Sequence, residues 1–255
     1  MQYALGHDPQ NHVLQPIAFV EWREFDADIG DFGRRGVQRA RHGVCFPRGA
    51  ALSEALRGIR EGPPTQFDFE CRLGWVQTIA EGVCSLHSEG VTHRDLKPGN
   101  IILVTGTGPA GFDVAGAEPR RDEVYLTDFG CARVMESLGQ AGAAASQVGT
   151  LQYMAPEVLW NEPRDDARVD VYALSIVSWE ILSVEVPFGG VPDPTAREMV
   201  RKGVRPQIPS EWPRGVREAI GRGWNSSALQ RGSAQQFFAT MYGPVLSVVA
   251  KGGGR

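Results

Sequence analysis

Lysine is scarce in this chain of 255 residues, and that scarcity limits the sites it can form. The lysines are Lys97, Lys202 and Lys251, so basic charge rests almost entirely on arginine. Acidic residues are in slight excess, which gives a formal net charge of −4. A chain of this charge gives no reason to expect non-specific nucleic-acid binding, and we expect no nucleic-acid partner.

Cysteine pairs and long apolar runs are lacking as well. The four cysteines, at positions 45, 71, 84 and 131, form neither a C-x-x-C pair nor a zinc-ligand spacing, which favours reduced thiols. No apolar run reaches about 18 residues, so no membrane span is expected. The first residues lack the charged and apolar blocks of a signal peptide. We therefore expect a cytoplasmic protein.

Helical periodicity dominates the sequence after residue 66. Apolar residues at steps of three and four predict a helix over residues 68–89. Residues 169–182 are apolar nearly all round, which predicts a helix inside a domain. Nearer the start, strands are predicted at residues 12–20 and 43–46, with a polar loop over residues 21–41.

Three short segments carry most of the chemical information. Residues 92–100 read Thr-His-Arg-Asp-Leu-Lys-Pro-Gly-Asn, residues 127–130 read Thr-Asp-Phe-Gly, and residues 149–157 read Gly-Thr-Leu-Gln-Tyr-Met-Ala-Pro-Glu. In this order they resemble the catalytic loop, the magnesium-binding turn and the end of the activation segment of a protein kinase. The resemblance covers about residues 10–245. It implies a protein-kinase-like α+β fold with a mainly helical large lobe and a partial small lobe.

The resemblance gives four residues a chemical role. Phosphoryl transfer needs an aligned nucleophile and neutralised phosphate charge. Asp95 would orient the substrate hydroxyl and accept its proton, and Lys97 would offset charge on the transferred phosphoryl group. Asn100 and Asp128 would be the oxygen ligands of Mg²⁺, which is a hard cation. The implied cofactors are ATP and Mg²⁺, with Lys97, Asn100 and Asp128 around the nucleotide.

The kind of substrate is also implied by the resemblance. The sequence Asp-Leu-Lys-Pro-x-Asn, which begins at Asp95, is typical of serine/threonine kinases within the family. Trp179 and the Arg205-Pro206 segment resemble the tyrosine-kinase-like group of these enzymes. The implied function is transfer of the ATP γ-phosphate to Ser or Thr of a protein substrate. The alternative is a non-catalytic, kinase-like binding or scaffold protein.

Other residues of the pattern imply structural and regulatory contacts. Asp170 would anchor the backbone of the catalytic loop, and Glu157 would pair with Arg231. Arg94, next to the catalytic aspartate, implies control by an upstream activating kinase that phosphorylates the activation segment. The candidate acceptors are Ser137, Ser146 and Thr150. Ser146 is the best placed of the three, and a plain solvated serine is the simpler interpretation of each.

The family's strand-three lysine has no counterpart, because no lysine precedes Lys97. The predicted strands at residues 12–20 and 43–46 resemble the family's strands four and five. The glycine-rich loop and most of the regulatory helix would then lie before Met1. Three explanations stay open: a fragment of a full kinase, which we favour; a natural short chain that serves as a binding module; or a second polypeptide that supplies the missing part.

We predict that the chain is divided into three parts. Residues 1–46 would be a partial small lobe with a loop insertion, residues 47–245 the large lobe, and residues 246–255 a flexible tail. Because the phosphate-binding lysine has no counterpart, we expect the chain alone to bind Mg-ATP weakly.

Overall fold

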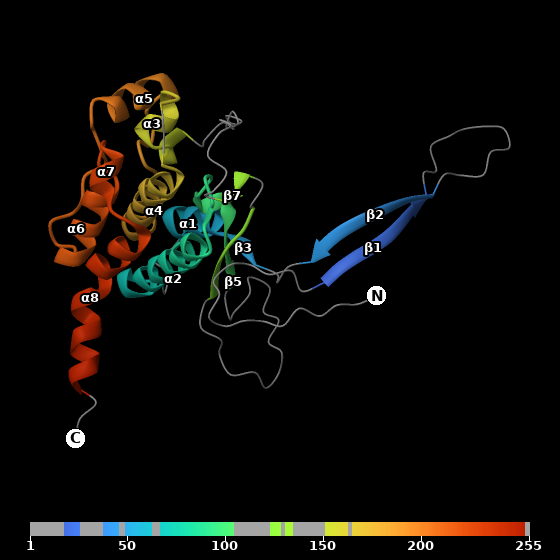
Figure 1. The fold of residues 1–255 in the computed structure, drawn as a ribbon, viewed down its shortest axis with the longest axis horizontal. Helices are drawn as coiled ribbons and strands as arrows, with labels where there is room; N and C mark the ends of the chain where they lie inside the picture. The colour runs from blue at the N-terminus through green and yellow to red at the C-terminus, as the bar shows by residue number, and fades with distance from the viewer. Residues whose placement is uncertain are drawn as a thin grey trace.

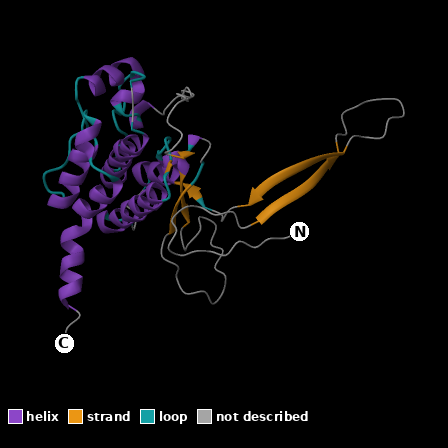
Figure 2. Cartoon of the chain, in the orientation of Figure 1, coloured by secondary structure: helices purple, strands orange, loops and turns teal. Residues whose placement is uncertain are grey.

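The computed structural model describes residues 18–25, 38–45, 49–62, 67–104, 123–128, 131–134, 151–162 and 165–252. Within these ranges the helices gather into one body, and short strands lie along one side of it (Figures 1 and 2). The described chain thus has the α+β character that the sequence predicts.

The strands are short. In chain order they are β1 (Ala18–Phe25), β2 (Gln38–Cys45), β3 (Ala50–Ala51), β4 (Val91–Thr92), β5 (Ile101–Val104), β6 (Glu123–Leu126) and β7 (Arg133–Val134). In the described part of the chain they form three antiparallel sheets, with strand orders β1-β2, β3-β5-β6 and β4-β7. The β4–β7 pair flanks the loop at residues 92–100, and β5 and β6 bring that loop to the turn at residue 128.

The β1–β2 hairpin corrects one prediction from the sequence. Residues 21–25 and 38–41, expected in a polar loop, are strand residues, with Glu21 opposite His42 and Phe25 opposite Gln38. The aromatic and β-branched residues of β1 favour a strand, which the count of polar residues in this segment obscured. The hairpin projects from the helical body (Figure 1). Residues 12–17 lie outside the described residues.

Helices make up most of the body. They are α1 (Leu52–Glu61), α2 (Phe69–Ser88), α3 (Pro156–Leu159), α4 (Asp166–Ser183), α5 (Asp193–Arg201), α6 (Arg214–Gly223), α7 (Ala228–Arg231) and α8 (Ala234–Gly252), with 3₁₀ turns η1 (Pro98–Asn100) and η3 (Leu151–Tyr153). The predicted helices at 68–89 and 169–182 are confirmed as α2 and α4. Helix α8 continues through much of the segment 246–255 that was predicted as a tail.

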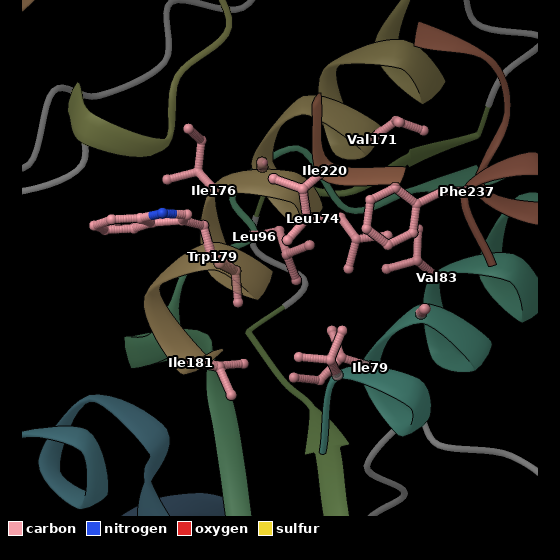
Figure 3. Close-up of a cluster of buried hydrophobic side chains, with 14 of the residues drawn as sticks. Ile79, Val83, Leu96, Val171, Leu174, Ile176, Trp179, Ile181, Ile220 and Phe237 are labelled. Carbon is pink, nitrogen blue, oxygen red and sulfur yellow. The ribbon is translucent and has the colours of Figure 1, made fainter. Parts of the chain in front are cut away.

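Helix α4 is the centre of the core. It packs against α2, α6 and α8, and Leu174, Ile176 and Ile181 on it are fully buried. Burial of one such side chain stabilises the fold by about 1.5–3 kcal/mol relative to exposure. Leu96 of the catalytic loop joins this cluster and lies among side chains of α2 and α4, including Ile79 (Figure 3). The core therefore fixes the loop directly, through an apolar residue between Asp95 and Lys97.

No helix in the described ranges is long and apolar enough to cross a membrane.

Helix α4 ends at a residue in the left-handed conformation, where glycine is usual. Val184 has φ 62° and ψ 15°, and its N–H donates to Glu180 O at 2.8 Å. The left-handed conformation costs a residue with a side chain roughly 1–2 kcal/mol. Glycine has more conformational entropy than valine in the unfolded chain, which offsets part of the stability gained when this strain is relieved. We predict that Val184→Gly raises the free energy of unfolding by about 0.5–1 kcal/mol, measured by urea denaturation.

Val204 provides the matched control for this substitution. It is an exposed valine that is not among the residues with positive φ. Val204→Gly should therefore leave the free energy of unfolding unchanged or lower it. A Val184→Gly variant that unfolds at lower urea than the parent would contradict the inferred strain.

Candidate active site

The loop at residues 92–100 is held by a buried carboxylate of α4. Asp170 accepts hydrogen bonds from the backbone N–H groups of His93, at 2.8 Å, and Arg94, at 2.7 Å. A third donor is the Nε2 of His87, in the last turn of α2, at 2.9 Å. Three donors satisfy an ionised group that would be costly to bury unpaired. The predicted anchoring of the loop by Asp170 is confirmed.

The chain turns sharply just before the proposed catalytic aspartate. Arg94 has φ 68°, and its N–H is the group that bonds to Oδ1 of Asp170. This hydrogen bond holds a backbone conformation that non-glycine residues seldom adopt. The following residue, Asp95, is consequently turned away from the core, with 19% of its side chain exposed.

Asp95, Lys97 and Asn100 lie in direct contact. Lys97 Nζ is 2.7 Å from Asp95 Oδ2. The Asn100 amide Nδ2 donates to Asp95 O at 2.8 Å and to the same Oδ2 at 2.9 Å. Both side-chain contacts therefore converge on one carboxylate oxygen. Among the described residues, none donates to Oδ1 of Asp95, so that oxygen is available to a substrate hydroxyl.

His93 connects this loop to the strand that leads into the metal-binding turn. Its buried ring places Nε2 3.0 Å from Thr127 O, and Nδ1 3.4 Å from the backbone N of Asp95. A carbonyl accepts and a backbone N–H donates, so Nε2 carries the proton and Nδ1 is the acceptor. One side chain thereby fixes the spacing between Asp95 and residue 127.

Asn100 and Asp128 are brought to the same edge by a backbone contact. The N–H of Thr127 donates to Asn100 O at 3.0 Å, and Asp128 follows with φ 60° and an exposed side chain. Since the amide nitrogen of Asn100 is committed to Asp95, its Oδ1 faces the other way, as an oxygen ligand. A carboxylate and an amide oxygen suit Mg²⁺, which commonly completes its shell with phosphate and water. These residues fit the implied metal.

The described residues contain no group of three or more His, Cys, Asp or Glu side chains that could hold a metal by themselves.

The predicted regulatory residues are only partly within view. The Arg94 guanidinium donates to Cys131 O at 3.4 Å, three residues after Asp128. Its side chain is thus turned toward the start of the activation segment. Ser137, Ser146 and Thr150 lie outside the described residues.

The predicted pair of Glu157 and Arg231 is confirmed. Two parallel hydrogen bonds join the groups, at 2.6 Å and 2.7 Å, and the Arg231 side chain is fully buried. Arg231 also donates to backbone carbonyls, including Asn225 O at 2.7 Å. Its guanidinium stacks over the ring of Tyr172, with its Cζ 5.1 Å from the ring centroid. The pair ties α3, beside the activation segment, to α7.

Sequence reasoning missed a second buried acidic residue, at the other end of α4. The Tyr153 hydroxyl of η3 donates to Glu180 Oε2 at 2.6 Å, and Arg60 of α1 lies 3.5 Å from Oε1. Burial raises the pKa of Glu180, while the bonds from Tyr153 and Arg60 oppose that rise. Burial also raises the pKa of Tyr153, with Glu180 adding to the effect. The sequence signal for this buried contact was a single glutamate in an otherwise apolar helical segment.

The helical body and the loop anchored on α4 define a protein kinase domain. The chain belongs to the protein kinase domain family, whose pattern matches residues 52–242. The predicted fold and class of protein are confirmed by this match.

The curated relatives are serine/threonine kinases. The chain is 32% identical over 166 residues to serine/threonine-protein kinase STY17 of Arabidopsis thaliana, covering 65% of this chain and 26% of that protein. It is 37% identical over 145 residues to PkaB of Streptomyces coelicolor, covering 56% of this chain and 33% of that one. Human mitogen-activated protein kinase kinase kinase 13 is 31% identical over 186 residues, covering 72% of this chain and 17% of that protein.

The chain thus spans about a quarter of the length of the plant relative and a smaller share of the human one. The similarity to both agrees with the predicted tyrosine-kinase-like group. The match and these relatives place the chain in the class of serine/threonine-type protein kinase domains.

Removal of one partner from the Glu157–Arg231 pair should be severe, because a fully buried guanidinium is left without its carboxylate. We predict that Glu157→Ala lowers the free energy of unfolding by about 3–5 kcal/mol, measured by chemical denaturation.

The matched control for Glu157→Ala is Glu218→Ala, which removes an exposed ion pair of the same 2.6 Å length with Arg214. Its melting curve should nearly match that of the parent, because exposed pairs contribute little. If Glu157→Ala and Arg231→Ala both melt like the parent, the buried pair does not exist in solution.

Proposed function

We propose that this chain is the catalytic part of a serine/threonine protein kinase that transfers the γ-phosphate of Mg-ATP to Ser or Thr of a protein substrate. The observation that carries the proposal is the contact of Asp95, Lys97 and Asn100. Lys97 Nζ and Asn100 Nδ2 both bond to Oδ2 of Asp95, which brings a cation and an amide to one carboxylate oxygen. A plain surface turn has no need of this arrangement.

Asp95 is the proposed general base. The substrate hydroxyl would donate to Oδ1, and the proton would pass to that oxygen as the hydroxyl attacks. Lys97 and Asn100 hold Oδ2, which fixes the rotation of the carboxyl group. The bond from His93 to Thr127 keeps the loop at a constant distance from the turn at residue 128. Positioning of this kind is the main requirement of phosphoryl transfer.

Lys97 and the metal ligands provide the charge. When bound, Mg-ATP supplies the phosphoryl group, and its metal neutralises part of the phosphate charge. Asn100 Oδ1 and the Asp128 carboxylate would hold the metal. Lys97, with 15% of its side chain exposed, can shift from Asp95 toward the phosphoryl group as negative charge develops there.

The division into lobes and the mode of control belong to the same proposal. Residues 47–245 would be the large lobe, residues 1–46 part of the small lobe and 246–255 the C-terminal segment. An upstream kinase would add a phosphate near Ser146, and Arg94 would bind it.

The test is transfer of labelled γ-phosphate from ATP to a generic Ser/Thr substrate. We measure it with the chain itself, and with residues 52–255 fused to the small lobe of a related serine/threonine kinase. We predict that Asp95→Asn lowers kcat by about 10²–10⁴-fold, because it keeps the shape but removes the proton acceptor. Asp128→Asn should also lower kcat strongly, because it removes a proposed ligand of the metal. Mn²⁺ in place of Mg²⁺ should therefore restore part of the activity of Asp128→Asn, and should not restore that of Asp95→Asn.

Glu211→Gln is the control, because Glu211 is exposed on the loop before α6, and the substitution should leave kcat unchanged. Equal activity of Asp95→Asn and parent would overturn the role of Asp95. A folded fusion that transfers no phosphate to any Ser/Thr substrate would favour the binding or scaffold function instead. Calorimetric titration of the chain alone should show weak Mg-ATP binding. Sub-micromolar affinity would contradict the expectation that the family's strand-three lysine has no counterpart here.

A further inference from the structure

The β1–β2 hairpin stands apart from the helical body (Figure 1). Its strands pair with each other over eight residues, and no described helix packs substantially against either of them. A sheet of two strands is only marginally stable in water, and a third strand or a packed surface is usually needed. The proposed phosphoryl-transfer chemistry uses none of its residues. The hairpin is therefore the part of the described chain that most needs a further partner.

Each strand of the hairpin has an outer edge. Within the described residues, β1 and β2 pair only with each other, so no described strand lies beside either outer edge. The backbone N–H and C=O groups along such an edge can pair with another strand. The two edges differ in sequence, and this difference indicates which of them can accept a strand.

Strand β2 is poorly suited to pairing with a second β2. It contains Arg39, Arg41 and His42 and no acidic residue. Every register of two β2 strands therefore leaves the basic residues without an opposite charge, and some registers place arginine opposite arginine. Charged edge strands of this kind oppose edge-to-edge association.

Strand β1, by contrast, is self-complementary. It reads Ala-Phe-Val-Glu-Trp-Arg-Glu-Phe, with a glutamate and an arginine on either side of Trp22. Two β1 strands that run antiparallel and are centred on Trp22 place Glu21 opposite Arg23 twice, because each copy contributes both residues. The same register places Phe19 opposite Phe25 twice and the two copies of Trp22 opposite each other. Opposite-charge and aromatic pairs in these positions stabilise a sheet.

Neighbouring registers lack this complementarity. A pairing centred on Glu21 or on Arg23 places that charged residue opposite its own copy, and like charges in opposite positions are destabilising. The two registers centred between residues place Glu21 opposite Trp22 or opposite Glu24. Among close registers, the one centred on Trp22 is therefore alone in matching both charge pairs. Its weakest position is Val20, which stands opposite Glu24.

We propose that β1 pairs with β1 of a second copy of this chain, antiparallel and centred on Trp22, in a dimer with a four-stranded sheet of order β2-β1-β1-β2. The arrangement has a two-fold axis, so it closes at two copies. The basic β2 strands lie at the outer edges of this sheet, where they oppose further growth. The inference is independent of the proposed function, because the hairpin contains none of the proposed catalytic residues.

The first measurement is the oligomeric state of the whole chain. Sedimentation velocity over a range of concentrations should show monomer and dimer, with no larger species. A chain that stays monomeric at its highest soluble concentration overturns the proposal. An open-ended series of larger species also overturns it, because that result indicates β1 against β2 of the next copy, a head-to-tail contact that does not close.

Charge reversal at the two facing positions tests the register. Glu21→Arg and Arg23→Glu each set like charges opposite each other at two places in the homodimer. Each should therefore raise the dissociation constant of the dimer at least about tenfold. Glu54→Arg and Arg57→Glu make the same changes at exposed positions of α1 and should leave the dimer unchanged. Equal weakening by the α1 variants contradicts the register.

The two hairpin variants also test each other. In an equimolar mixture, a Glu21→Arg copy meets an Arg23→Glu copy with opposite charges at both facing positions, so a mixed dimer should form. The double variant Glu21→Arg/Arg23→Glu should recover the homodimer for the same reason. Either recovery excludes loss of the hairpin as the cause of the effect of the single variants. A mixture and a double variant that both stay monomeric overturn the pairing.

A disulfide across the proposed two-fold axis provides a second readout. Trp22→Cys should give a covalent dimer on oxidation, because opposite residues of paired strands are about 4.5–5.5 Å apart, within the span of a disulfide. Val20→Cys is the matched control, since its two copies would lie four residues apart along the sheet, about 13 Å. The parent, with its natural cysteines, gives the background. Equal cross-linking of the two variants, or none above the background, contradicts a pair centred on Trp22.

Discussion

The hydrogen bonds to the buried carboxylate of Asp170 are the interaction on which the rest of the site depends. Helix α4 is apolar nearly all round, so its ionised residues need partners inside the protein. Asp170 obtains them from the backbone of His93 and Arg94 and from His87. The cost of leaving this charge unpaired forces the loop into the left-handed turn at Arg94. That turn in turn places Asp95 at the surface.

The same constraint operates twice more on the helical body. Arg231 is fully buried, and it is matched by Glu157, next to the segment that ends at residue 157. Glu180 is buried at the other end of α4 and is matched by Tyr153 and Arg60. Each of these buried ionisable groups holds a segment that lies far from it in the sequence. The apolar core thus stabilises the body, and the paired charges determine where the functional loops attach.

The sequence predicted those parts of the fold that repeat or are chemically distinctive. Periodicity located α2 and α4, and the motif at residues 92–100 identified Asp95, Lys97 and Asn100 as neighbours. The extent of β1 and β2 was not predictable, because strand formation depends on pairing with residues that are distant in sequence. His87, Tyr153 and Arg60 were missed for the same reason. Their partners lie many residues away, and only folding brings them together.

Helix α4 also fixes the distance between the catalytic loop and the segment that contains Tyr153. Asp170 and Glu180 are ten residues apart, which is about 15 Å along a helix. The helix between them is fully packed, and a packed core resists small deformations. Asp170 at one end holds the loop that carries Asp95, and Glu180 at the other end holds Tyr153. The two segments therefore keep a constant spacing, which is set by the rigid helix between them.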